Sequence, residues 1–119
     1  KPIITINSDL FTNFDFSSLN DINPKKCHLV LIENPEHNPE GDFGTANGLL
    51  TNKNAQHTYT YSGIGVFSPE FILQNDNFDK IGKLIRQYIA SNDITCEIFD
   101  GTWHDIGTKE RLEQLELEL

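Results

Sequence analysis

The chain has 119 residues, enough for one modest hydrophobic core and therefore for a single domain or part of one. Its apolar fraction of 37% and charged fraction of 23% are those of a folded globular protein. The net charge of -9 argues against nucleic acid or an anionic membrane as a partner, because both require a basic face. The chain contains no apolar run of about 18 residues and does not begin like a signal peptide, so we expect a cytoplasmic protein.

The first half of the chain contains three predicted strands. Residues 2–6 form an apolar, β-branched run typical of a strand buried on both faces, and polar residues follow it immediately. Residues 27–32 have the same character. Residues 33–56 are rich in Asn, Gly, Pro and Thr, which predicts loops with a short hairpin. Residues 59–67 are the third strand, with glycines that allow close approach to its backbone.

The second half alternates helices with strands. Residues 80–91 are expected to be helical because apolar side chains recur on one face: Ile81, Leu84, Ile85, Tyr88 and Ile89. Asp100-Gly101 predicts a tight hairpin between residues 94–99 and 102–105. Thr108 is a candidate cap for a last helix, which carries Leu112, Leu115 and Leu119 on one face and Glu110 near its positive end. This alternation predicts an α/β fold with a mixed sheet.

Neither the cysteines nor the histidines form a metal-binding or redox pattern. Cys27 and Cys96 lie in apolar, strand-like segments, and we expect both to be reduced core residues. The four histidines are scattered without the spacing of zinc ligands.

Two aspartates are candidates for metal and phosphate chemistry. Asp9 follows the first predicted strand, and in open α/β sheets ligands bind beyond the carboxyl ends of the strands. Asp105 lies between a predicted strand and the last helix. Together they would provide the carboxylates that a divalent cation needs beside a phosphate. The alternative is structural: Asp9 in a turn and Asp105 as support for a helix start.

A second set of residues has the groups that sugar recognition needs. Gly41 and Asp42, together with Ser62 and Gly63, combine close backbone approach with a carboxylate and a hydroxyl. A bulged hairpin with no ligand is the alternative interpretation of the glycines.

Four segments together resemble a known family. They are Asn7-Ser8-Asp9-Leu10, Gly41-Asp42-Phe43, residues 61–67 with Ser62-Gly63-Ile64-Gly65, and Trp103-His104-Asp105-Ile106-Gly107-Thr108 followed by Glu110-Arg111-Leu112. Their order and approximate spacing are similar to those of the sugar-1-phosphate nucleotidyltransferases, which make nucleoside-diphosphate sugars. Within this family the likeness is greatest to the N-acetylmuramate 1-phosphate uridylyltransferases of peptidoglycan recycling, followed by the mannose-1-phosphate guanylyltransferase-like enzymes.

The resemblance implies a fold and a role for each matching residue. The fold would be the Rossmann-like nucleotide-diphospho-sugar transferase fold, with residues 1–119 forming a single partial domain that holds the sugar and the metal. Asp9 and Asp105 match the acids that bind catalytic Mg²⁺. The positions that match substrate-binding residues are Asn7, Gly41, Asp42, Ser62, Gly63 and Lys80.

The chain departs from the family pattern in two places. Ser8 stands where the family usually has glycine, which puts the turn that presents Asp9 in question. The N-terminal Gly-x-Gly-x-Arg loop, which in the family cradles the triphosphate, does not occur in the chain. We therefore expect the 119 residues alone to be inactive and the intact enzyme to join a sugar 1-phosphate to a nucleoside triphosphate, giving for example UDP-N-acetylmuramate. The alternatives are a non-catalytic sugar-phosphate-binding or regulatory module and a fragment without a role of its own. A truncated sheet would also leave an edge open to self-association.

Overall fold

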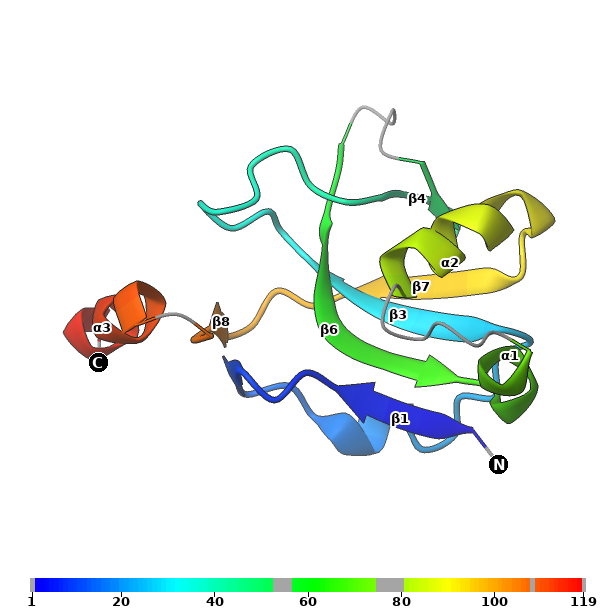
Figure 1. Cartoon of the computed structure of the whole chain (residues 1–119), viewed down its shortest axis with the longest axis horizontal. Helices are drawn as coiled ribbons and strands as arrows, with labels where there is room; N and C mark the ends of the chain where they lie inside the picture. Colours follow the sequence, from blue (N-terminus) through cyan, green and yellow to red (C-terminus); the bar gives the residue numbers. More distant parts are fainter. Residues whose placement is uncertain (1, 53–56, 75–80, 108, 119) are drawn as a thin grey trace.

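A computed structural model describes residues 2–52, 57–74, 81–107 and 109–118. The strands are β1 (Ile3–Ile6), β2 (Leu10–Thr12), β3 (Cys27–Ile32), β4 (Gly44–Ala46), β5 (Leu49–Thr51), β6 (Thr60–Phe67), β7 (Ile94–Ile98) and β8 (Trp103–Asp105). They form a six-stranded sheet in the order β1-β6-β3-β7-β5-β4 and a separate pair, β2-β8. Figure 1 shows β8 apart from the central strands β3, β6 and β7. The helices are α1 (Pro69–Leu73), α2 (Ile81–Tyr88) and α3 (Lys109–Glu118), with the 3₁₀ turns η1 (Phe16–Leu19) and η3 (Ile89–Ser91).

The sheet is mixed, which confirms the predicted α/β class. β3 is buried along its whole length and pairs parallel with β7 and antiparallel with β6. β1 also pairs antiparallel with β6, so β1, β3 and β7 run in one direction. The hairpin expected within residues 33–56 is β4-β5. The helix expected at residues 80–91 is observed as α2 and η3 from residue 81 onward, while Lys80 and residues 53–56 lie outside the described part of the chain.

Apolar side chains cover both faces of the sheet. One face packs against α1 and α2 through a core that contains Cys27, Leu29, Leu31, Phe43, Leu50, Phe67, Phe71, Ile85, Ile89, Ile94 and Cys96. The other face carries a smaller core of Phe14, Leu19, Val30, Ile64 and Val66. Both cysteines are free and buried, as expected from their strand-like surroundings. Within the described residues, no helix is long and apolar enough to cross a membrane.

The prediction that the first strand is buried on both faces is wrong for this chain. β1 is an edge strand, and Ile3 and Ile4, which point to opposite faces, are 44% and 36% exposed. No described segment lies beyond its outer edge, so the apolar run meets solvent there. Such an edge still predicts self-association. Sedimentation velocity of the 119-residue chain tests this, and a monomer at all concentrations would contradict it.

The predicted hairpin around Asp100-Gly101 is also wrong. β7 ends at Ile98 and pairs with β3 and β5, whereas β8 pairs with β2 in the second sheet. Gly101 instead allows a close crossing, because a Cβ there would meet the side chains of Phe99 and Asn13. α3 follows β8 and buries Leu115, while Leu112 is 40% exposed. The expected cap Thr108 lies outside the described residues, and so does Leu119.

Candidate functional site

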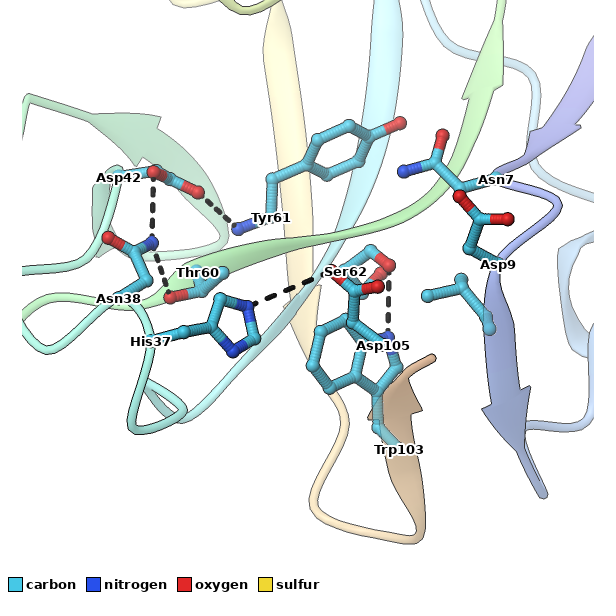
Figure 2. A pocket seen from close by; sticks show the side chains of 11 residues that line it. Asn7, Asp9, His37, Asn38, Asp42, Thr60, Tyr61, Ser62, Trp103 and Asp105 are labelled. Atoms are coloured by element: carbon cyan, nitrogen blue, oxygen red, sulfur yellow. Dashed lines mark hydrogen bonds and ion pairs between the residues drawn. The ribbon is translucent and has the colours of Figure 1, made fainter. Parts of the chain in front are cut away.

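A pocket of about 310 Å³ lies at the sheet edge where β1 and β3 end. The strands running in one direction bring their carboxyl ends to this edge, which is the usual ligand position in open α/β sheets. Figure 2 shows the side chains that face it. The lining residues are Asn7, Asp9, Leu10, His37, Asn38, Asp42, Thr60, Tyr61, Ser62, Trp103 and Asp105.

The structure brings Asp9 and Asp105 together, although 95 positions separate them in the chain. The cause is the β2-β8 pair, in which Leu10 lies opposite Asp105 and the N–H of Ile106 donates to the carbonyl of Asp9 at 2.8 Å. A Cβ on Gly107 would lie 3.1 Å from Oδ2 of Asp9 and 3.1 Å from Oδ1 of Asp105. Those two oxygens are therefore separated by at most twice that distance. Glycine at 107 leaves the space between the carboxylates open.

Asp105 is held by its neighbours, whereas Asp9 is exposed. The N–H of Gly107 donates to Oδ1 of Asp105 at 2.9 Å. On the other side, Nε2 of His37 lies 3.8 Å from Oδ2 of Asp105. Asp9 follows Ser8 in the turn between β1 and β2. Asn47 and Asn92 are the only non-glycine residues in the described part of the chain with positive φ, so Ser8 adopts this turn without the backbone conformation that requires glycine.

The donor chemistry of this pair fits Mg²⁺. Magnesium prefers hard oxygen ligands and typically takes one or two carboxylates, keeping water and substrate phosphates at its other positions. Asp9 and Asp105 offer that number of carboxylates on an open pocket. No group of three or more His, Cys, Asp or Glu side chains placed for a metal occurs among the described residues. The arrangement is therefore suited to a cation shared with a ligand rather than to a closed protein cage.

Asp42 lines the pocket, but its carboxylate is already engaged by the protein. One oxygen accepts the backbone N–H of Tyr61 at 2.9 Å and the other accepts from the amide of Asn38 at 3.1 Å. The Asn38 amide also donates to the hydroxyl of Thr60 at 3.0 Å. Gly41 does not line the pocket. It has a φ of +74°, and a Cβ there would approach Thr58 Oγ1 to 2.8 Å, so its role in the structure is to form the turn before Asp42.

Ser62 also reaches the pocket, but its hydroxyl is turned away from a ligand. It is 1% exposed, donates to the carbonyl of Val30 at 2.6 Å and accepts the N–H of Ile64 at 3.1 Å. This bond lies at the irregularity in the β3-β6 ladder between Val30 and Leu31. The expected sugar contact through this hydroxyl is therefore not supported, because both of its strong hydrogen bonds are internal.

Gly63 acts on the site through Asn7. Its φ is +88°, and a Cβ would lie 2.5 Å from Nδ2 of Asn7. Only glycine leaves room for this side-chain amide. The backbone N–H of Asn7 also donates a hydrogen bond to the carbonyl of Gly63, which holds Asn7 beside Gly63. Asn7 thus lines the pocket beside Asp9, where the sequence places it, whereas the predicted substrate residue Lys80 lies outside the described residues.

Sequence reasoning missed several lining residues, above all His37. Its imidazole stacks on the indole of Trp103 with centroids 6.5 Å apart and planes at 24°. The only sequence signal was a histidine between two prolines, in a segment that predicts a turn. Tyr61 was named only within a motif. Burial raises the pKa of Tyr61 to about 12, against an opposing hydrogen bond with Thr5, so its phenol stays neutral.

Comparison with known proteins supports the likeness that the motifs predict. No protein-family model matches the chain. The chain is 28% identical over 123 positions to an N-acetylmuramate alpha-1-phosphate uridylyltransferase from Neisseria meningitidis serogroup B, covering 96% of this chain and 53% of that protein. A solved structure described as a glucose-1-phosphate thymidylyltransferase from Bacillus anthracis, in complex with sucrose, matches with a TM-score of 0.71. That match has 15% identity and covers 98% of this chain and 54% of the other.

These comparisons confirm the fold class and the likeness to a sugar-1-phosphate nucleotidyltransferase. The chain spans about half the length of the curated relative and of the solved structure that it matches.

Proposed function

We propose that the chain is the sugar- and metal-binding part of a nucleotidyltransferase that joins a sugar 1-phosphate to a nucleoside triphosphate. The observation that carries this proposal is the convergence of Asp9 and Asp105 on one polar pocket at the carboxyl ends of β1 and β3. The name of the bacterial relative makes N-acetylmuramate 1-phosphate and uridine triphosphate the first substrates to test.

The reaction needs positioning and charge stabilisation rather than a protein base. An oxygen of the sugar 1-phosphate, already ionised at neutral pH, forms a bond to the α-phosphorus while the bond to the β-phosphate oxygen breaks and pyrophosphate leaves. Asp9 and Asp105 would hold Mg²⁺, which offsets charge on the phosphate oxygens when bound. The Asp42-Asn38-Thr60 network and the fixed indole of Trp103 give the sugar a rigid wall, and rigid placement of reactants lowers the barrier.

This proposal is tested by measuring pyrophosphate release by the intact protein that contains this chain. The assay uses Mg²⁺, uridine triphosphate and N-acetylmuramate 1-phosphate. We expect Asp105→Asn to lower kcat by roughly 10²–10³-fold while sugar-phosphate KM changes little, because the lost charge acts mainly in the transition state. Asp21→Asn is the matched control, since Asp21 is exposed and lies outside the pocket.

The outcomes separate this function from a binding module. Sugar-phosphate binding without turnover of any nucleoside triphosphate would refute the enzyme and favour the non-catalytic alternative. A folded Asp105→Asn protein with full activity would refute the assigned role of Asp105. As part of the same proposal we place the protein in the cytoplasm, where nucleoside triphosphates are made, and cell fractionation that finds it elsewhere would contradict this.

A further inference from the structure

Asn13 lies at one end of the strand pair β2-β8, whose other end carries Asp9 and Asp105. Its Oδ1 accepts the backbone N–H of Thr102 at 2.9 Å, and its own backbone N–H donates to the carbonyl of Thr102 at 3.2 Å. Both backbone polar groups of Thr102 are therefore bonded to one residue, 89 positions away in the chain. Asn13 is not among the described residues that line the pocket, so any effect on the site passes through β2 and β8.

The register of β2 against β8 decides whether the two carboxylates meet. The ladder has only three residue pairs, from Leu10 opposite Asp105 to Thr12 opposite Trp103. Because side chains alternate along a strand, a slip by one residue would turn the Asp105 carboxylate to the face away from the pocket. Burial sets this register only weakly, since no residue of either strand is buried and no third strand in the described part of the chain joins the pair.

Gly101 leaves the space that the contact between Asn13 and Thr102 needs. A Cβ at Gly101 would lie 2.8 Å from Oδ1 of Asn13 and would also meet the ring of Phe99. Any side chain at this position would therefore displace the oxygen that accepts the Thr102 N–H. The glycine of the expected hairpin turn thus serves a contact between β2 and β8 instead.

The exposed position of Asn13 separates a positioning role from a stabilising one. Water competes for a hydrogen bond at an exposed site, so losing the bond to Thr102 costs little free energy of unfolding. The residues of both hydrophobic cores lie outside the β2-β8 pair, so this pair can open while the six-stranded sheet stays folded. Loss of the Asn13 acceptor should therefore loosen the pair without unfolding the protein.

We propose that Asn13 is a positioning residue for Asp9 and Asp105, because its side-chain carbonyl fixes the register that places both carboxylates on the pocket. The purpose of this register rests on the proposed function, but the register itself is a property of the metal-free protein. At the opposite end of the ladder, the N–H of Ile106 donates to the carbonyl of Asp9 at 2.8 Å. Hydrogen exchange of this N–H therefore reports whether the register is kept.

The test measures amide hydrogen exchange by NMR in the intact protein without metal. Asn13→Leu keeps the branched shape of the side chain but removes the acceptor, whereas Asn13→Asp keeps an acceptor oxygen in the same place. The matched control is Asn20→Leu, because Asn20 is also exposed but lies outside the strand pair. The N–H groups of β3, which is buried along its length, report on the stability of the main sheet.

We expect the Ile106 N–H to exchange roughly 3- to 10-fold faster in Asn13→Leu, the factor that one net hydrogen bond supplies. Asn13→Asp and Asn20→Leu should exchange at the wild-type rate, and the β3 rates should change less than about twofold in all variants. The inference is overturned by an unchanged Ile106 rate in Asn13→Leu, by an equal rise in β3, or by failure of Asn13→Asp to restore protection. An Ile106 N–H that is unprotected in the wild type overturns it as well.

Titration with Mn²⁺ separates this inference from the proposed function. The Mn²⁺ affinity should fall roughly 3- to 10-fold in Asn13→Leu and remain near the wild-type value in Asn13→Asp. Faster exchange of Ile106 together with wild-type Mn²⁺ affinity in Asn13→Leu would overturn the positioning role. A wild type that binds no Mn²⁺ refutes the proposed metal site and the positioning role with it, while the exchange rates still show whether Asn13 holds β2 and β8 together.

Discussion

Replacing Ser62 with alanine distinguishes a structural serine from a sugar-binding one. The change removes a hydroxyl that donates to the carbonyl of Val30 and accepts the N–H of Ile64 at a site that is 1% exposed. Both backbone groups lose their partner where water has no access. A buried polar group left unsatisfied costs about 1–3 kcal/mol, so we expect Ser62→Ala to lower the free energy of unfolding by about 2–3 kcal/mol.

Urea denaturation followed by fluorescence of Trp103, the single tryptophan, measures this loss. The control is Ser18→Ala, because the Ser18 hydroxyl also bonds to a backbone carbonyl, that of Asp15, but in an exposed position. We expect its effect to stay below about 1 kcal/mol, since water replaces the partner. The reasoning is refuted if Ser62→Ala is as stable as the wild type and instead raises the KM for the sugar phosphate.

Three further predictions follow from the same structure. Gly63→Ala should cost about 1–2 kcal/mol because its φ is positive, and it should lower kcat/KM by displacing Asn7; wild-type stability and kinetics would contradict this. Burial raises the pKa of Cys27 from 9.0 to about 12, so at pH 9 the thiol should react with a disulfide reagent only after unfolding. Because the native state keeps the proton of the Cys27 thiol, the free energy of unfolding should fall as pH rises from 9 toward 12. Rapid labelling of Cys27 in the folded protein at pH 9 would contradict the raised pKa of this thiol. The 119-residue chain alone should release no pyrophosphate above background, which the assay above measures directly.

The sequence was informative where burial and local chemistry decide the structure. The continuous apolar run of β3 and the apolar stripe of α2 predicted both elements, because β3 is buried on both faces of the sheet and α2 packs its apolar stripe on one of them. The positions of Asp9 and Asp105 at element ends also predicted that each faces a ligand edge. Their meeting could not be derived from local pattern, since it depends on the pairing of β2 with β8 across the chain.

The errors have physical causes of the same kind. Asp100-Gly101 has good hairpin chemistry, but the pairing of β8 with β2 outweighs that local preference. The apolar run of β1 suggested burial on both faces, yet burial depends on what lies beyond the strand, and no described segment lies there. His37 was missed because its significance comes from stacking on Trp103 and closeness to Asp105, neither of which leaves a sequence pattern.

The most direct test of the account is whether Asp9 and Asp105 share one divalent cation. Manganese can stand in for magnesium at an oxygen site, and electron paramagnetic resonance measures free Mn²⁺ during titration of the intact protein. We predict one site per chain, weakened by roughly tenfold or more in both Asp9→Asn and Asp105→Asn and unchanged in Asp21→Asn. Wild-type Mn²⁺ affinity in either of the first two variants, with the fold intact, would contradict the central claim.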